Sequence, residues 1–506
     1  MDRRAFLRRV AALAGAAAVG PHLLRSASVG AAVVAGPGPY GALQAANGDG
    51  IQLPAGFTSR VIATAGQPVA GTGHTWHGSP DGGACFPATG GGWIYVSNSE
   101  RGGSTGGASA VRFATDGSIA AAYTILSGTN ANCAGGATPW GTWLSCEENL
   151  GIGRVYECDP QQPGQGVQRP LLGTFTHEAA AVDPITGHVY LTEDDPSGRL
   201  YRFAPVTPGD LTAGTLQAAS VSGTSVSWVP VSTTSPERSA STTAFNGGEG
   251  EWISDRTLWF TTKGDSRVWE LDLDTQQLVV LYAFATTPGG ALSGVDNLTV
   301  HELSGDIFVA EDGGNMEVCI IGSVAGQDTV APFLRFVGHD TSEVTGPAFS
   351  PDGTRLYVSS QRGSTGTTGV TYEITGPFRT AAPPPTVVTV PISVDSYVRD
   401  GTYASSTFGA ATTLQICRST SASSNRISYF QLDTTGVTDA VASATLRLWC
   451  RGTTTTATTV QVFGVGAPWS EDAVTWATRP ALGAVVGSFA LTNATYGWKE
   501  IDLTAY

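Results

Sequence analysis

The stretch HVYLTEDD, residues 188–195, contains the pattern on which the fold prediction depends. It is a short run of β-branched, aromatic and apolar residues that ends in a cluster of acids. A run of this kind, closed by polar turn-forming residues, is typical of a β-strand that ends in a loop. The pattern recurs as WIYVSNSE (93–100), TWLSCEE (142–148), TLWFTTKGD (257–265), DIFVAEDGG (306–314) and RLYVSSQRG (355–363).

The spacing of these copies predicts the architecture. Most begin about 50 residues after the previous one, and the longer step from 188 to 257 leaves room for an insertion near residues 205–240. A β pattern with this period is typical of a propeller, whose blades have about four strands each. Helical periodicity is almost absent. We therefore predict an all-β chain that begins with a six-bladed β-propeller.

A second element precedes most copies and resembles the neighbouring strand of the same blade. It reads NCAGG around Cys133, HEAAAVDP around Glu178, GGEGEW around Glu249, DNLTV around Asp296 and TGPAFSPDG around Gly346. Turn sequences such as VDPITG (182–187) join the two strands. The polar residue that opens one strand then lies beside the acid that ends its neighbour, so these pairs surround one mouth of the central channel.

This ring predicts a metal site. Its candidate ligands are Cys133, Glu147, Glu148, Glu178, Glu193, Asp194, Glu249, Asp296, Glu311 and Asp312. Carboxylates that converge need cations, because like charges at short range raise one another's pKa. Carboxylate oxygens suit Ca²⁺, and a thiolate among them suits a transition metal such as iron. The alternative is that the acids only cap turns on a solvated rim and that Cys133 is a buried thiol.

Composition and length limit the remaining possibilities. The chain has 506 residues and a net charge of −15, which argues against a nucleic-acid partner. At this length we expect two or more domains. The run TAAPPPTVVTVP contains a proline-rich linker at 381–387, which separates a propeller at 48–380 from a second domain at 388–506. No stretch after the N-terminus is long and apolar enough for a membrane helix.

Residues 1–46 resemble an export signal and leader. Arg3 and Arg4 precede Phe6, Leu7 and a short apolar run of small residues, as in a twin-arginine signal. We expect cleavage between Ser26 and Ala46, export by the twin-arginine pathway, and a periplasmic, extracellular or cell-wall-associated location. Of the seven cysteines, Cys417 and Cys450 both lie in the second domain and could form a disulfide there.

The second domain is predicted to be a jelly-roll-like β-sandwich. Short alternating strands recur in blocks such as SYFQLDTTGV, ATLRLWCRG and WKEIDLT. These blocks resemble DNRLRE-type, carbohydrate-binding-module-like domains of exported bacterial enzymes. The resemblance depends on Asp395, Tyr397, Arg399, Asp433, Trp469, Trp476 and Trp498. It implies a polysaccharide or cell-wall glycan as a partner, and a domain truncated at its C-terminal end. Any one of the tryptophans could equally be core.

The propeller blocks resemble the PhoX-type alkaline phosphatase family. The resemblance is carried by NCAGGATPWGTWLSCEE (132–148), HEAAAVDPITGHVYLTED (177–194), NGGEGEW (246–252), GVDNL (294–298) and FVAEDGGNM (308–316), together with TGPAFSPDGTRLYVSSQRG (345–363). It implies an exported six-bladed propeller that hydrolyses phosphate monoesters with Fe³⁺ and Ca²⁺ in its channel. It also implies Cys133 as an iron ligand, and Glu148, Glu178, Glu249 and Asp296 as metal ligands.

One feature complicates the expected activity. The family's basic phosphate clamp is expected near Glu249, where this chain has Asn246, Gly247 and Gly248. Lys263 and Arg362 end two of the repeated strands and could orient the phosphate of a small ester substrate, although salt bridges to neighbouring carboxylates are the alternative.

Two other function classes stay open. The first is a calcium-dependent lactonase or esterase propeller, which would not need the thiolate of Cys133. The second is a non-catalytic, metal-stabilised binding protein attached to glycans. Nothing in the sequence requires more than a monomer. The templates HExxH and GxxxxGK[ST] are absent from the sequence.

Overall fold

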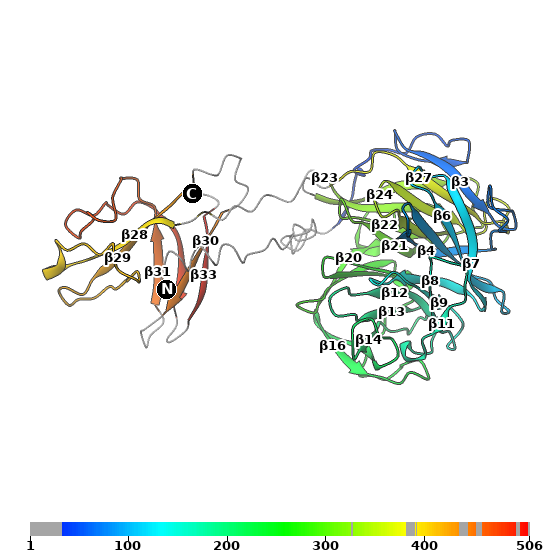
Figure 1. Cartoon of the computed structure of the whole chain (residues 1–506), viewed down its shortest axis with the longest axis horizontal. Helices are drawn as coiled ribbons and strands as arrows, with labels where there is room; N and C mark the ends of the chain where they lie inside the picture. The colour runs from blue at the N-terminus through cyan, green and yellow to red at the C-terminus, as the bar shows by residue number, and fades with distance from the viewer. Residues whose placement is uncertain are drawn as a thin grey trace. The chain divides into compact units, whose positions relative to one another are not determined.

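The computed structural model of the chain describes residues 33–324, 327–380, 390, 392–434, 444–451, 458–491 and 496–503. The chain divides into two compact units, one within residues 33–380 and one within 390–503 (Figure 1). The predicted linker at 381–387 and the first 32 residues of the predicted signal and leader lie outside the described residues. In the described part, no helix is long and apolar enough to cross a membrane.

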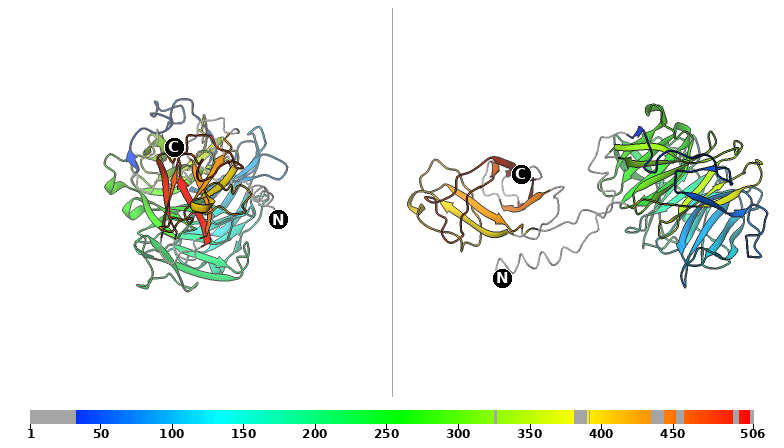
Figure 2. Two further views of the ribbon diagram at one scale, coloured as in Figure 1. Left: turned by 90° about the vertical axis from the view of Figure 1, so that its left-hand side faces the viewer. Right: turned by 90° about the horizontal axis from the view of Figure 1, so that it is seen from above.

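The all-β prediction is confirmed, since both units are made of strands and short helical turns (Figure 2). In the first unit, strands follow one another as antiparallel neighbours. The first two runs are β4 (Pro80–Pro87), β5 (Trp93–Ser99), β6 (Gly106–Phe113) and β7 (Ile119–Thr129), then β8 (Asn132–Ala137), β9 (Trp143–Glu147), β10 (Val155–Cys158) and β11 (Val167–Gln168).

The next sheet has nine strands and consists of two such runs. They are β12 (His177–Val182), β13 (Val189–Glu193), β14 (Tyr201–Pro205), β15 (Gly214–Ser222) and β16 (Ser225–Pro230), then β17 (Gly248–Ser254), β18 (Thr257–Thr262), β19 (Arg267–Asp272) and β20 (Gln277–Ala283). Strand β16 joins them where Ser225 pairs with Gln277. The predicted insertion near 205–240 therefore contains β15 and β16.

Each of the last two sheets of the unit includes strands from its N-terminal part. One contains β21 (Val295–His301), β22 (Asp306–Glu311), β23 (Glu317–Val324) and β24 (Gln327–Phe336), with β1 (Val34–Ala35) and β2 (Ile51–Gln52) paired to β24. The other contains β25 (Val344–Phe349), β26 (Arg355–Ser360), β27 (Val370–Thr375) and β3 (Thr58–Thr64). Pairing of β3 with β27 joins the two ends of the unit, which closes the arrangement.

The first strand of every run faces a common centre. Strand β8 contacts β4 and β12, β17 contacts β12 and β21, and β25 contacts β21 and β4, so these strands form a closed ring. Apolar side chains pack between neighbouring sheets; Trp259 of β18, for example, packs in one cluster with Val300 and Val309. Full burial of such a side chain contributes roughly 1.5–3 kcal/mol. The first unit is therefore propeller-like, with its core between the sheets.

Each strand of this ring carries an irregularity at the same place. The pairing register with the second strand slips after the opening residues, at Asp81–Gly82, Cys133–Ala134, Glu178–Ala179, Glu249–Gly250, Asp296–Asn297 and Gly346–Pro347. A β-bulge of this kind adds an unpaired residue and re-aims a side chain. The polar residues that open the predicted strands therefore occupy equivalent bulged positions.

The second unit contains three antiparallel pairs in its described residues. They are β28 (Ile392–Arg399) with β29 (Arg426–Leu432), β30 (Thr445–Arg451) with β33 (Tyr496–Asp502), and β31 (Thr458–Phe463) with β32 (Val485–Leu491). Val398, Tyr429 and Val474 form a small core against which Trp469 and Trp476 pack. Cys417 and Cys450 are free thiols, so the suggested disulfide is not formed. The β-sandwich stays a prediction.

Candidate metal centre

The bulged positions bring buried acids and a thiol together at one end of the ring of strands. Side chains of Asp81, Glu178, Glu249 and Asp296 are buried, and Cys133 is half-buried. The equivalent position in β25 is Gly346, at φ +59°, where a Cβ atom would lie 2.5 Å from the backbone oxygen of Asp81. No side chain fits at this position, so the sixth strand of the ring contributes nothing from its bulge.

A second set of side chains comes from the residue that follows the second strand of each run. These residues are Glu100, Glu148, Asp194, Lys263, Asp312 and Gln361. Glu148 follows β9 directly, and its backbone N–H donates to the backbone oxygen of Ala131, just before β8. This pairing holds the end of the second strand beside the opening of the first, as the sequence predicted.

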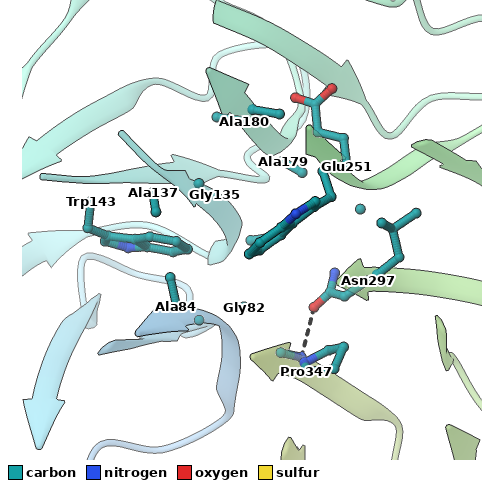
Figure 3. Close-up of a pocket in the computed structure, with 18 of the residues that line it drawn as sticks. Gly82, Ala84, Gly135, Ala137, Trp143, Ala179, Ala180, Glu251, Asn297 and Pro347 are labelled. Atoms are coloured by element: carbon teal, nitrogen blue, oxygen red, sulfur yellow. Dashed lines mark hydrogen bonds between the residues drawn. The ribbon is translucent and has the colours of Figure 1, made fainter. Parts of the chain in front are cut away.

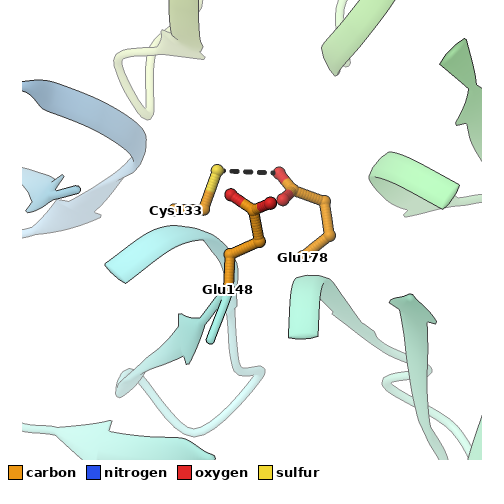
Figure 4. Close-up of side chains that lie close together, drawn as sticks. All are labelled: Cys133, Glu148 and Glu178. Carbon is orange, nitrogen blue, oxygen red and sulfur yellow. Dashed lines mark hydrogen bonds between the residues drawn. The ribbon is translucent and has the colours of Figure 1, made fainter. Parts of the chain in front are cut away.

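Donor atoms at this end of the ring form three groups, two of which share a residue. Ligand atoms within each group lie within 4.8 Å of one another, and the groups are Cys133–Glu148–Glu178, Glu178–Glu249–Asp296 and Asp81–Glu100–Glu343. The Cys133 thiol donates to Glu178 Oε1 at 3.3 Å, and Glu148 reaches toward both (Figure 4). Glu178 belongs to two of the groups and therefore connects them.

The electrostatics of this cluster favour a cation. Burial, and then the charges of Asp194 and Glu100, raise the pKa of Glu148 to about 8. Burial and then Asp312 raise the pKa of Asp296 to about 7, and burial and then Asp296 raise that of Glu343 to about 9. Burial also raises the pKa of the Cys133 thiol and of Glu178. The acidic side chains of this cluster outnumber the basic side chains that pair with them.

The two predicted basic residues lie at the cluster and are held by its acids. Lys263 Nζ is 2.8 Å from Asp194 Oδ2 and 2.8 Å from Glu249 Oε1. The Arg362 guanidinium donates to both oxygens of Glu343, each at 2.9 Å. The alternative noted for the sequence, salt bridges to neighbouring carboxylates, therefore describes both residues.

Three of the predicted acids lie outside the cluster. Glu147, Glu193 and Glu311 are the last residues of β9, β13 and β22, each directly before an acid that faces the cluster. Successive side chains of a strand point to opposite faces, so these three side chains point away from the cluster. Glu147 accepts from the backbone N–H of Asn130 at 2.9 Å, and Glu311 from that of Ser293 at 2.7 Å.

Glu193 forms hydrogen bonds with neighbouring side chains of the fold instead. Its carboxylate accepts hydrogen bonds from the Tyr201 hydroxyl at 3.0 Å and from Arg238 at 2.7 and 2.9 Å. Arg238 belongs to the segment between β16 and β17, so the pair ties that segment to the sheet. Glu311 is also part of a separate buried group with Glu317 and Cys319.

The structure adds members that sequence reasoning missed. Asp81 opens β4 at the same bulged position as Glu178, but no repeated motif had been recognised there. Glu343 directly precedes β25, and Glu100 ends WIYVSNSE, the first repeated strand. The position of Glu100 after its strand is the signal that could have placed it in the ring.

Two asparagines organise the ligands. Asn98 donates to the backbone oxygens of Cys133 and Ala134 at 3.3 and 2.7 Å and accepts from Trp143 Nε1 at 2.9 Å. Asn297 donates to Asp296 Oδ1 at 2.9 Å and accepts from the backbone N–H of Gly346 at 2.9 Å. Asn98 of β5 thus binds the bulge of β8, and Asn297 bridges the ring strands β21 and β25, which orients the bulges.

A cavity of about 100 Å³ continues between the same strands. It is lined mainly by glycine and alanine, with Trp143 and Glu251 among the larger side chains (Figure 3). Small residues allow the strands of the ring to approach closely.

Fold and site together define a propeller-like protein with a cluster of carboxylates and one thiol that is a candidate metal site. The comparisons with known proteins agree with that class. The family model of alkaline phosphatase PhoX matches residues 93–152 and 151–264, and carbohydrate-binding module family 96 matches residues 386–506. Both resemblances read from the sequence are therefore confirmed. No curated protein matches the sequence.

Solved structures support the fold of the first unit. The PhoX of Pseudomonas fluorescens, in complex with the transition state analogue vanadate, is 17% identical with a TM-score of 0.53, over 68% of this chain and 98% of that one. A gluconolactonase of Xanthomonas campestris is 16% identical with a TM-score of 0.38, over 67% of this chain and 99% of that one. At these identities the PhoX likeness shows a shared propeller-like fold.

Proposed function

We propose that this chain is an exported, metal-dependent phosphatase that hydrolyses phosphate monoesters at an iron and calcium centre in the channel of a six-bladed propeller. The observation that carries the proposal is the Cys133–Glu148–Glu178 group. It joins a thiol to the buried carboxylate of Glu178 and the half-buried carboxylate of Glu148, inside the segment that matches the PhoX family. A thiolate beside carboxylates suits iron, and the all-carboxylate groups suit calcium.

The donor chemistry of the described residues fits these ions. The carboxyl groups converge, their pKa values are raised by burial and by one another, and few protein cations neutralise them. We assign Cys133, Glu148 and Glu178 to iron, and the carboxylates of Asp81, Glu100, Glu249, Asp296, Asp312 and Glu343 to calcium. Bound there, the ions would supply Lewis-acid stabilisation of phosphoryl charge and a more acidic attacking water.

The basic residues of the site would position the substrate. The side chain of Lys263 passes beside Gly247, where a Cβ atom would lie 3.1 Å from Lys263 Cγ. This closeness supports the proposal that Lys263 takes the place of the family's basic clamp. Its ammonium has three N–H donors, of which the two carboxylates use two. We propose that the third N–H of Lys263 and an edge of the Arg362 guanidinium hold phosphoryl oxygens.

The second unit is proposed to attach the enzyme to a glycan. Trp449 and Trp498 face one another across β30 and β33 with 60% and 50% of their surfaces exposed. Their ring centroids are 5.4 Å apart. Such exposed aromatic faces on a sheet can stack on sugar rings, and the family 96 match supports this use. Trp469 and Trp476, by contrast, pack against the core of the unit.

The first test is elemental analysis of the exported protein together with p-nitrophenyl phosphate hydrolysis. Iron and calcium with turnover that chelation abolishes is the expected result. Calcium without iron, combined with lactone or carboxylic ester hydrolysis, would overturn the phosphatase in favour of a lactonase. Bound metal without any hydrolysis would instead favour a non-catalytic, metal-stabilised binding protein.

A further inference from the structure

The residue after the second strand differs in charge from one run to the next. It is an acid at Glu100, Glu148, Asp194 and Asp312, an amide at Gln361 and a cation at Lys263. Where it is an acid, it adds a ligand to the cluster. Where it is Lys263, it brings a positive charge to a position that otherwise supplies oxygen atoms.

Lys263 lies between two carboxylates from neighbouring runs. Asp194 follows β13, and Glu249 occupies the bulge of β17. Both N···O distances are 2.8 Å, and the side chains of Glu249 and Asp194 are 3% and 14% exposed. The geometry is that of a single cation held by two carboxylates, one of which also belongs to the Glu178–Glu249–Asp296 group.

The backbone fixes the lysine in this position. Lys263 begins the short turn η2 (Lys263–Asp265), and its backbone N–H donates to the oxygen of Gly247 at 2.8 Å. The next N–H, of Gly264, donates to the oxygen of Asn246 at 3.0 Å. These bonds hold the backbone of Lys263 against the residues that precede β17, and the two carboxylates hold its ammonium.

We propose that Lys263 is a resident cation that takes the place of one divalent metal ion at the Asp194–Glu249 edge of the cluster. This inference depends on the proposed metal centre and determines how many ions it holds. A divalent ion and an ammonium compete for the same oxygens, so the lysine keeps a metal ion away from Asp194 and from Oε1 of Glu249. Gln361 forms a similar bridge as a neutral donor, to Asp81 at 2.6 Å and Glu100 at 2.8 Å.

The test is the metal content of Lys263→Met, purified as the full chain, measured by elemental analysis after dialysis against micromolar calcium. Methionine keeps much of the length and removes the charge. We expect about one additional calcium ion per chain. Lys263→Arg keeps the cation and should match the unaltered protein. So should Lys499→Met, since Lys499 is the only other lysine of the chain and lies in the second unit.

An unchanged or lower calcium content in a folded Lys263→Met protein would overturn the proposal. Should the variant be unstable, its melting temperature is measured in chelator and in millimolar calcium. Stabilisation by calcium that exceeds that of the unaltered protein supports the proposal, and equal stabilisation overturns it. Absence of metal from the unaltered protein would instead refute the metal centre itself, so the two failures are distinguishable.

Discussion

The thiol of Cys133 donates a hydrogen bond of 3.3 Å to Oε1 of Glu178, a carboxylate on the neighbouring strand of the ring. Both residues sit in β-bulges, of β8 and β12. Their proximity joins two runs of the propeller-like unit at the point where a thiolate could share an ion with carboxylates. The first prediction concerns this pair.

Replacing Cys133 by serine should remove iron and activity together. A hydroxyl is a poor ligand for iron compared with a thiolate. We expect phosphatase activity to fall at least about tenfold, equivalent to ~1.4 kcal/mol of transition-state stabilisation. Elemental analysis and p-nitrophenyl phosphate hydrolysis check this. Cys417→Ser, in the second unit, is the matched control. Retention of iron in Cys133→Ser would remove this residue from the ligand set.

The stability of metal-depleted protein should fall as pH rises. The raised pKa values of Glu148, Asp296 and Glu343, about 8, 7 and 9, mean that the folded state binds more protons than the unfolded state above about pH 4. Unfolding then releases protons, so the free energy of unfolding decreases from about pH 4 up to about pH 9.

The measurement is the melting temperature in chelator between pH 5 and pH 9. We expect a continuous decrease, and a much smaller one with calcium and iron present, since the ions replace the protons. A chelated protein that becomes more stable over this range would contradict the charge repulsion inferred for the cluster.

Glu193 and Glu178 should respond oppositely to neutralisation. Glu193→Gln loses charged contacts to Arg238 and should destabilise the fold by roughly 1–3 kcal/mol while metal content stays unchanged. Glu178→Gln should lose metal. In chelator it should be no less stable than the unaltered protein, because it removes one of several repelling carboxylates. Thermal melts and elemental analysis separate the two. Loss of metal from the Glu193→Gln variant would instead indicate that Glu193 is a metal ligand.

Processing of the N-terminus should occur at or before Val33. Within the predicted cleavage window, 26–46, Val33 is 4% exposed in the core of the first unit. Tyr40 contacts the rings of Phe57 and Phe333, with centroids 5.1 and 5.6 Å away. Cleavage beyond Tyr40 would remove both and cost roughly 2–5 kcal/mol. N-terminal sequencing of the exported protein checks this, and a mature protein that begins after Val33 would contradict it.

Glycan attachment should depend on Trp449 and Trp498. Loss of both rings should weaken binding severalfold, since each aromatic contact contributes about 0.5–1.5 kcal/mol. The measurement is cosedimentation of the double alanine variant with peptidoglycan sacculi and with cellulose. Leu482→Ala, another exposed apolar residue of this unit, is the control. Equal binding by the double variant would place any glycan site elsewhere.

Much of the fold and part of the site could be read from sequence. The repeated strand ends, such as TEDD after β13 and CEE at β9, are local patterns of alternating apolar residues closed by polar ones. They predicted the sheets, the ring of acids, and Cys133, Glu148, Glu178, Glu249 and Asp296 at its mouth. Asp81 and Glu343 could not be found in this way, because neither stands in a repeated motif and only the closure of the ring brings them close.

The amino-acid sequence by itself determined which residue types are available at each strand end, since strand propensity and turn chemistry are local properties. It did not determine which of two adjacent acids faces the cluster. Glu148, Asp194 and Asp312 face the cluster while Glu147, Glu193 and Glu311 do not. The reason is that side chains alternate along a strand, and the phase of that alternation is set by pairing with the neighbouring strand and its bulge. Tertiary structure also decided that Lys263 lies between two carboxylates, because Asp194 and Glu249 come from different runs that only the closed ring brings together.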